Sequence, residues 1–219
     1  MASFGCITSV GTSLERLLNA CFVQVAIPGP GTTTKAVLVR TEDFKAAAGG
    51  RINPPALSIF LYRIDFNKAT RAAWSAVGSL DGFAHLPLDL HYMLTPWASD
   101  AAIEHGIMGV AMQCLETTPI LSGPLLTAEG GWAPNEGVQL VLEDTPTEWV
   151  MRTFDSLPTD FKLSVPYLAR VVVLDGREQR GSPPVRTAIL GLTDPAKAAA
   201  VEEWRRAQAA AIPDRPRTQ

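Results

Sequence analysis

Residues 86–97 carry the clearest alternation of hydrophobic and polar positions in the chain. Leu86, Leu88, Leu90, Tyr92 and Leu94 alternate with Pro87, Asp89, His91 and Met93. This period of two is typical of a β-strand with one buried face. Pro96 ends the run, and Asp100 follows it as a helix N-cap. The pattern predicts a central strand that passes through a short turn into a helix.

Helical spacing appears in several other segments. Apolar residues recur every three or four positions in residues 7–21 and 100–116, which predicts two amphipathic helices. The run Thr145-Pro-Thr-Glu148 has the form of a capping box with proline at the first helical position, so a short helix should follow it. A terminal helix is expected after Asp194-Pro195, with Glu202 paired to Arg206 one turn later.

The remaining periodic segments predict further strands. They are residues 35–40, 56–66, 138–142 and 163–174, with residues 22–27 and 185–192 as candidates for two more. Residues 56–66 are apolar on both faces, so we expect both faces to be covered. Pro166 lacks a backbone N–H and therefore predicts an edge strand or a bulge.

Three connections separate these elements. Pro28-Gly-Pro-Gly31 is a break, and residues 117–137 are a loop rich in glycine and proline. Residues 67–85 form a connection far longer than the usual ~4 to 6 residues and carry Lys68, Arg71 and Trp74. The simplest interpretation is a solvated excursion with one packed tryptophan. The alternative is a contact between subunits, because tryptophan and arginine are enriched at interface anchors.

These elements together predict a single domain of the α/β (α+β) class. We expect a mixed, mostly antiparallel sheet of about five or six strands flanked by about three or four helices. The domain should span residues 1–192, followed by a C-terminal helix and a disordered basic tail in residues 193–219. The net charge is only -3, so no basic field for nucleic acid or anionic membrane is present.

The cysteines and the amino-terminal segment bear on the compartment. Cys6, Cys21 and Cys114 are odd in number and have no CxxC spacing, so we interpret them as free, buried thiols of a reducing compartment. No basic residue precedes Arg16, and polar residues interrupt the apolar run, so neither a signal peptide nor an anchor is predicted. No apolar window reaches the ~18 to 20 residues of a membrane helix. The protein is expected to be cytosolic when made.

Several chemical interpretations fail on residue spacing. Residues 29–35 lack the glycine that a phosphate-binding loop needs before its lysine, because Thr34 stands there. Asp89 and His91 share one strand face, and Glu104 and His105 follow on the next helix, which suggests a metal site or a His-carboxylate base. Adjacent helical residues point about 100° apart, so Glu104 and His105 cannot easily face one ion. No catalytic residue, metal or cofactor is therefore predicted.

The motifs of the chain resemble those of a known family. The central block Leu86–Ala98, followed by Glu104-His105, Gly109, Met112-Gln113 and Thr118-Pro-Ile-Leu121, is similar to the cap, or tail-terminator, proteins of phage-tail-like contractile injection systems. Further segments fit the same family: Leu61-Tyr-Arg63 with Asn67 and Arg71, Leu142-Glu-Asp144 with Glu148, and Leu163–Tyr167 through Arg170-Val-Val172 to Asp175. The resemblance covers about residues 7–175.

The resemblance implies a structural part and no catalytic site. Members of this family assemble as a sixfold ring at the tail end distal to the baseplate, close the inner tube, contact the last sheath ring and stop tail growth. The partners implied are copies of the chain, the tube protein and the sheath protein. The residues expected at assembly contacts are Lys68, Arg71, Trp74, Asp89, His91, Trp132, Trp204 and Arg205. A monomeric adaptor or cargo-docking protein, and a small metal-dependent hydrolase, are the alternatives.

Overall fold

A computed structural model describes residues 2–25, 33–45, 50–71 and 83–176, together with residues 202–204 and 206. The chain divides into two units, residues 1–180 and 181–219. The expected domain boundary between residues 192 and 193 lies outside the described residues and stays a prediction. The same holds for the Pro28–Gly31 break, the candidate strand at 185–192 and the disordered tail.

The described part of residues 2–176 contains four α-helices and six strands, with three short 3-10 helices between them, and residues 202–204 and 206 are also helical. The α-helices are α1 (Cys6–Gln24), α2 (Lys68–Arg71), α3 (Ala101–Thr117) and α4 (Thr147–Asp155). The strands are β1 (Lys35–Val39), β2 (Ala56–Phe66), β3 (His85–Trp97), β4 (Ile120–Ser122), β5 (Gly137–Leu142) and β6 (Val165–Asp175). The 3-10 helices are η1 (Thr41–Phe44), η2 (Gly123–Leu125) and η3 (Ala128–Gly130).

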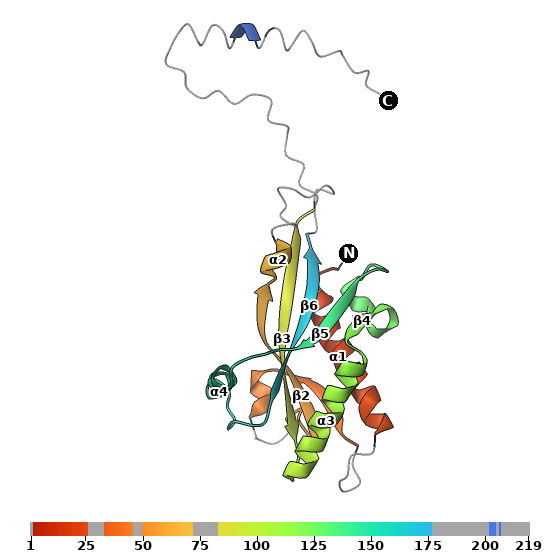
Figure 1. The fold of residues 1–219 in the computed structure, drawn as a ribbon, viewed down its shortest axis with the longest axis vertical. Coiled ribbons are helices and arrows are strands. Elements are labelled where there is room, and N and C mark those ends of the chain that lie inside the picture. Colours follow the sequence, from red (N-terminus) through yellow and green to blue (C-terminus); the bar gives the residue numbers. More distant parts are fainter. Residues whose placement is uncertain are drawn as a thin grey trace. The chain divides into compact units, whose positions relative to one another are not determined.

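The strands form one six-stranded sheet in the order β1-β2-β3-β6-β5-β4. Only β1 and β2 are parallel, and every other neighbouring pair is antiparallel. The predicted mixed, mostly antiparallel sheet is therefore confirmed. The alternating strand at 86–97 is β3, which lies in the middle of the sheet between β2 and β6 (Figure 1).

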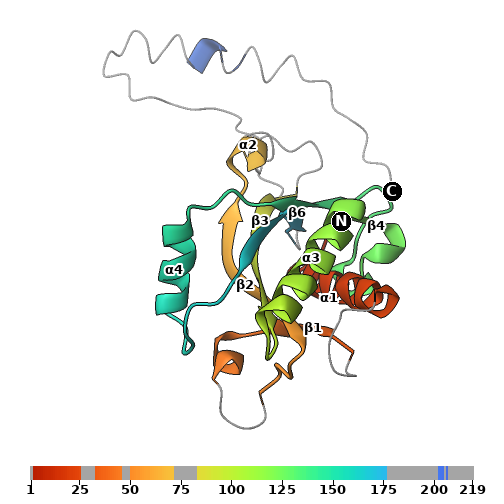
Figure 2. The same cartoon turned by 60° about the horizontal axis from the view of Figure 1, so that its bottom comes forward.

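Helices lie on both faces of the sheet. Figures 1 and 2 show α1 and α3 together on one side and α4 alone on the other side. The larger core lies under α1 and α3, and a smaller cluster of Met93, Val150 and Phe154 lies under α4. Because α4 covers part of the second face, residues 90–96 of β3 are buried on both faces. The expected strand with only one buried face is wrong for this half of β3.

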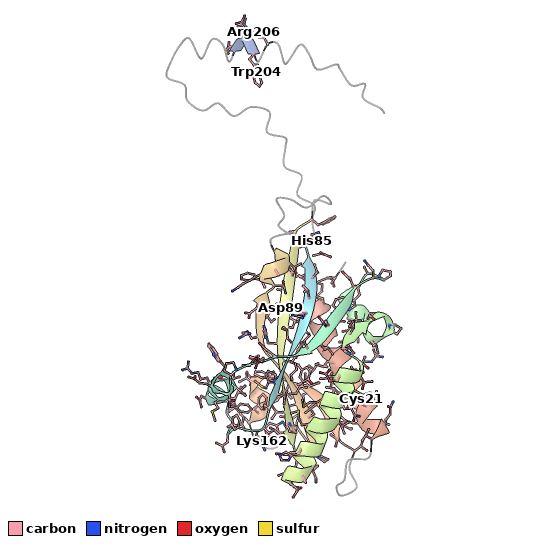
Figure 3. The ribbon with its side chains drawn as sticks, viewed as in Figure 1. Cys21, His85, Asp89, Lys162, Trp204 and Arg206 are labelled. Atoms are coloured by element: carbon pink, nitrogen blue, oxygen red, sulfur yellow. A yellow bond between two sulfur atoms is a disulfide. The ribbon has the colours of Figure 1, made fainter. Side chains whose placement is uncertain are left out.

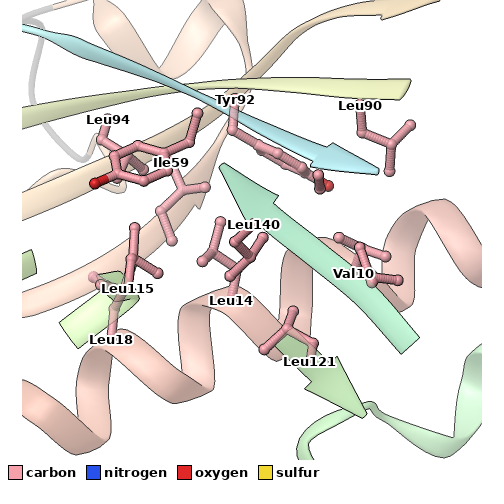
Figure 4. Packing of buried hydrophobic residues seen from close by; sticks show 14 of the residues in the cluster. Val10, Leu14, Leu18, Ile59, Leu90, Tyr92, Leu94, Leu115, Leu121 and Leu140 are labelled. Atoms are coloured by element: carbon pink, nitrogen blue, oxygen red, sulfur yellow. The ribbon is translucent and has the colours of Figure 1, made fainter. Parts of the chain in front are cut away.

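The larger core packs α1 against the central strand β3. Val10, Leu14 and Leu18 of α1 point at Leu90, Tyr92 and Leu94 of β3 (Figure 4). All six side chains are at most 1% exposed. Burying each large apolar side chain contributes about 1.5–3 kcal/mol, so the helical stripe and the strand alternation stabilise one another.

Of the two alternatives predicted from Pro166, the edge strand is wrong, and no bulge lies at this residue because β6 keeps its register with β3 from Val165 to Ala169. β6 is an interior strand, with β3 on one side and β5 on the other. The pairing of β5 with β6 ends at Tyr167, and beyond it the Pro166 carbonyl accepts a hydrogen bond from Glu143 N at 3.0 Å. The N–H and C=O of a strand residue point to the same neighbour. The N–H that proline lacks would therefore face β5 just past the last ladder pair, where its absence costs little.

Four local expectations also change. Residues 22–24 continue α1 and do not start a strand. The loop at 117–137 contains β4, η2 and η3. The second half of β2 is not covered on both faces, because all of residues 63–66 are exposed. The helix at 147–155 forms, but its N-cap is Pro146 without a side-chain cap bond, and the Thr145 side chain interacts with Tyr62 instead.

The expectation of three free cysteines is wrong. Cys21 of α1 and Cys114 of α3 form a disulfide with a Cα–Cα distance of 6.2 Å, and Cys6 is free and buried. The two residues are 93 positions apart in the sequence. They meet because α1 and α3 pack side by side on one face of the sheet (Figure 3).

Candidate functional site

A polar cluster joins β2, β3 and the residue after β5 on the sheet face that also carries α4. Arg63 and His91 are register partners on β2 and β3, directly after the register shift between Leu61 and Arg63. That shift is a bulge, which re-aims the side chains that follow it. Glu143 reaches the same place from the end of β5, where its backbone N–H is held by Pro166.

His91 is the centre of this cluster. Its Nδ1 lies 2.9 Å from Glu143 Oε2 and its Nε2 lies 3.3 Å from Asp65 Oδ2. Arg63 Nη2 lies 3.3 Å from Glu143 Oε1, and Arg63 Nε lies 3.0 Å from Asp65 Oδ2. The His91 side chain is only 6% exposed. The strand alternation predicted that His91 would lie on the outer face of β3, but side chains from two neighbouring segments cover it there.

Tyr62 completes the cluster. Its hydroxyl lies 3.2 Å from Glu143 Oε2 and donates to it. Burial, and then the adjacent Glu143 carboxylate, raise the pKa of Tyr62 to about 12, because both disfavour a phenolate. The hydroxyl therefore stays a hydrogen-bond donor at neutral pH. One arginine, two carboxylates, a tyrosine and a histidine satisfy one another here, which ties three segments together.

Asp89 lies on the same face of β3, half-buried (Figure 3). Its two carboxylate oxygens accept hydrogen bonds from Asn67 Nδ2, each at 3.1 Å. Asn67 Oδ1 in turn accepts from Thr70 N at 2.9 Å, which caps the first turn of α2. Asp89 therefore positions the start of the 67–85 connection. Lys68 is exposed at that start, whereas the Arg71 side chain and Trp74 lie outside the described residues.

Trp132 is held within the fold. Its Nε1 donates to Ser9 Oγ of α1 at 2.8 Å, and Ser9 Oγ donates to the Thr127 carbonyl at 2.8 Å. A Cβ at Gly130 would lie 2.1 Å from Trp132 Nε1, so only glycine leaves room for this indole. Trp132 is half-buried against the core. Its first role is to fasten the 117–137 segment to α1.

The second unit holds the last two of the expected assembly residues. Trp204 is 55% exposed, and Arg205 lies outside the described residues. The expected pair of Glu202 with Arg206 is present at 3.5 Å, and both side chains are largely exposed. An exposed pair of this kind contributes little to stability.

Sequence reasoning did not single out Arg63, Tyr62 or Glu143 as a group. They come from segments about 80 residues apart that only the sheet order brings together. A signal was available, because Arg63 and Glu143 stand in two of the blocks that carry the family resemblance. Glu104 is elsewhere, where it pairs with Lys162 Nζ at 3.2 Å. Within the described residues, no three His, Cys, Asp or Glu side chains gather as a metal site.

The comparisons with known proteins agree with the family resemblance of the sequence blocks. The model of the Pvc16 N-terminal domain matches residues 9–187. No curated protein sequence matches the chain. Of the helices in the described ranges, none combines the length and apolar character needed to cross a bilayer.

Two solved structures are similar in fold. A cryo-EM structure of the anti-feeding prophage cap, the AFP tube-terminating cap, aligns with a TM-score of 0.50 and 18% identity over 92% of this chain and 69% of that one. The sheath/tube terminator of the extracellular contractile injection system PVC, in its extended state, aligns with a TM-score of 0.49 and 17% identity over 93% of this chain and 71% of that one.

Proposed function

The chain belongs to the Pvc16 N-terminal domain family, and from this premise we propose that it is the cap, or tail terminator, of a contractile injection system. The family match over residues 9–187 carries the proposal. The fold shared with the AFP tube-terminating cap agrees with it. In this role the protein closes the inner tube and the sheath at the end distal to the baseplate and ends tail growth.

The proposed assembly is a homo-hexameric ring that contacts the tube protein and the sheath protein. A ring subunit needs two different surfaces that fit each other around the circle. The role is structural: it involves no catalysis or cofactor and no nucleic-acid or membrane partner. Assembly takes place in the cytoplasm, and the finished particle can leave the cell.

The contacts of the described residues refine the expected assembly surface. Lys68 is exposed and directly available, and we propose that the connection from residue 67, with Arg71 and Trp74, reaches a neighbouring subunit. Asp89 supports this connection through Asn67, and His91 stiffens the sheet behind it through Glu143. Trp132 presents the exposed part of its ring, and Trp204 and Arg205 are proposed contacts of the second unit.

Electron microscopy of particles from a strain that lacks this gene tests the proposal. Tails of uncontrolled length, or tails that lose their sheath, are the expected result. Tails of normal length with intact sheath would overturn the cap role. The native mass of the purified protein is a second test. A ring predicts a six-subunit species when tube or sheath is present. A monomeric adaptor predicts the mass of one subunit under all conditions.

A further inference from the structure

A groove lies where β2 begins and β3 ends, apart from the His91 cluster. It encloses about 680 Å³ between the segment before β2 and the connection from α4 to β6. Its apolar lining consists of Phe44, Ile52, Pro54, Trp97, Leu157 and Pro158. A lining that combines aromatic and proline side chains suits an extended, proline-containing peptide.

The aromatic wall of the groove is fixed before anything binds. Trp97 Nε1 donates to Ser58 Oγ at 2.9 Å, and the Lys162 ammonium lies 5.0 Å from the Trp97 ring centroid. The Phe44 ring is 6.0 Å from the Trp97 ring and 5.2 Å from the Phe60 ring. A wall held in this way loses little conformational freedom on binding, which favours affinity.

The charged residues of the groove differ in their availability. Asp43 is occupied, because its Oδ2 accepts from Arg40 N at 3.0 Å and its Oδ1 lies 3.7 Å from Arg40 Nε. Asp160 is exposed on the other wall and makes no ion pair with a described residue. Lys45 adds one cation on the side of Asp43. Asp160 is therefore the carboxylate that can receive a cationic side chain of a ligand.

The sequence of this protein contains a segment with the matching chemistry. Residues 213–217 read Pro-Asp-Arg-Pro-Arg, so the two prolines are three positions apart and an arginine stands on each side of the second proline. A Pro-x-x-Pro spacing favours the polyproline II conformation, in which prolines dock on aromatic walls and an adjacent arginine pairs with a carboxylate. We propose that this groove binds residues 213–217 of a second copy of the chain, with a proline against the half-buried Trp97, which Phe44 supports from behind, and an arginine at Asp160.

The choice of a second copy as the source of residues 213–217 rests on the proposed ring function. A closed ring needs a heterologous contact in which one subunit offers a ligand and its neighbour offers a site. Residues 177–212 can span on the order of 100 Å when extended, so their length does not prevent a neighbour from being reached. Exchange of this one segment would link every subunit to the next.

Peptide binding to the full chain tests the groove. The protein carries alanine at Pro213, Arg215, Pro216 and Arg217, so that its own segment cannot compete, and a labelled peptide of residues 209–219 is titrated while fluorescence anisotropy is recorded. Saturable binding is expected, with an affinity lowered about tenfold or more by Asp160→Arg, because a charge-assisted pair is replaced by repulsion. Asp155→Arg, a charge reversal at another exposed aspartate, on α4 and outside the groove, should leave the affinity unchanged.

Equal binding of the peptide to the Asp160→Arg and Asp155→Arg proteins would overturn the assignment of the groove, as would equal binding of a peptide with the prolines and arginines replaced by alanine. A mixing experiment then tests the second copy. A chain with Asp160→Arg and an intact segment is combined with a chain with an intact groove and the alanine segment. The two should associate with each other and not with themselves, as measured by sedimentation velocity.

A mixture that stays monomeric while the peptide binds would overturn the second copy as the source. These outcomes are separate from the cap role itself. Normal tails in the deletion strain would remove the cap role whatever the peptide does. Uncontrolled tails together with absent peptide binding would remove only the groove proposal.

Discussion

The side-chain amide of Asn67 donates to both carboxylate oxygens of Asp89, at 3.1 Å from each. Asn67 follows β2 and Asp89 lies inside β3, so the pair fastens the start of the 67–85 connection to the centre of the sheet. The side-chain oxygen of Asn67, Oδ1, accepts from Thr70 N and so caps α2. The start of this connection is thereby held against the sheet.

Replacement of Asp89 by alanine should loosen the start of the 67–85 connection without unfolding the domain. The loss of one hydrogen-bonded pair costs about 0.5–1.5 kcal/mol, and the effect should be local because β3 keeps its ladder bonds. Amide hydrogen exchange should show faster exchange in residues 67–71 and unchanged exchange in β6. Asp155→Ala is the matched control, and unchanged exchange in residues 67–71 would contradict the role of Asp89.

The disulfide between Cys21 and Cys114 predicts a redox-dependent stability. Replacing both residues by serine should lower the free energy of unfolding by about 2–4 kcal/mol, because the unfolded chain loses a long covalent loop. A reductant should lower the denaturation midpoint of the wild-type protein and leave that of the double variant unchanged. Thiol titration of the denatured protein should find one thiol before reduction and three after it. Three thiols before reduction would contradict the bond.

The Tyr92 hydroxyl is buried without a hydrogen-bond partner among the described groups. Burial of an unpaired hydroxyl is unfavourable, so Tyr92→Phe should leave the free energy of unfolding unchanged or raise it by about 1 kcal/mol. Tyr92→Ala should lower it by about 3–5 kcal/mol, because it leaves a cavity under α1. Urea unfolding of the two variants measures both. A clear loss of stability in Tyr92→Phe would mean that the hydroxyl is bonded.

All three tyrosines of the chain, Tyr62, Tyr92 and Tyr167, have raised pKa values, with burial as the first cause in each case. A raised pKa means that the folded state keeps the proton that the unfolded state releases above pH 10. The stabilising contribution is therefore present below pH 10 and is lost as the pH rises towards 12, where Tyr62 titrates.

Tyrosinate absorbance and circular dichroism, recorded together against pH, test this prediction. Little tyrosinate should form near pH 10, and its main rise should coincide with loss of structure. In Glu143→Gln the carboxylate no longer opposes the phenolate, so Tyr62 should titrate at a lower pH than in the wild type. A tyrosinate rise near pH 10 in a fully folded protein would contradict the burial of these hydroxyls.

Gly130→Ala tests the fastening of Trp132. The new methyl group would overlap the indole, so the ring must leave Ser9 Oγ, and the free energy of unfolding should fall by about 1–3 kcal/mol. Thermal unfolding, with near-ultraviolet circular dichroism to follow the tryptophan environment, measures the change. Gly109→Ala is the control, because a Cβ there meets nothing within 4 Å. A stability of Gly130→Ala equal to that of the wild type would show that Trp132 can move at no cost.

The sequence by itself determined the elements that depend on local periodicity. The alternation in residues 86–97 gave the position of β3, and the spacing of Val10, Leu14 and Leu18 gave the buried face of α1. Asp100 was predicted as the N-cap of α3, and its side chain accepts from Ala102 N at 2.7 Å. These features follow from residues within one or two turns of each other, so the order of residues specifies them. The blocks around β3 also carried the family resemblance.

The tertiary structure alone decided which distant segments meet. It placed β6 between β3 and β5 and so made the strand with Pro166 an interior one. It brought Glu143 and Arg63 onto His91, which buried a side chain whose alternation predicted exposure, and it paired Cys21 with Cys114. Each of these contacts joins residues more than 20 positions apart, and a contact of that kind depends on strand order and helix packing, which local spacing does not specify.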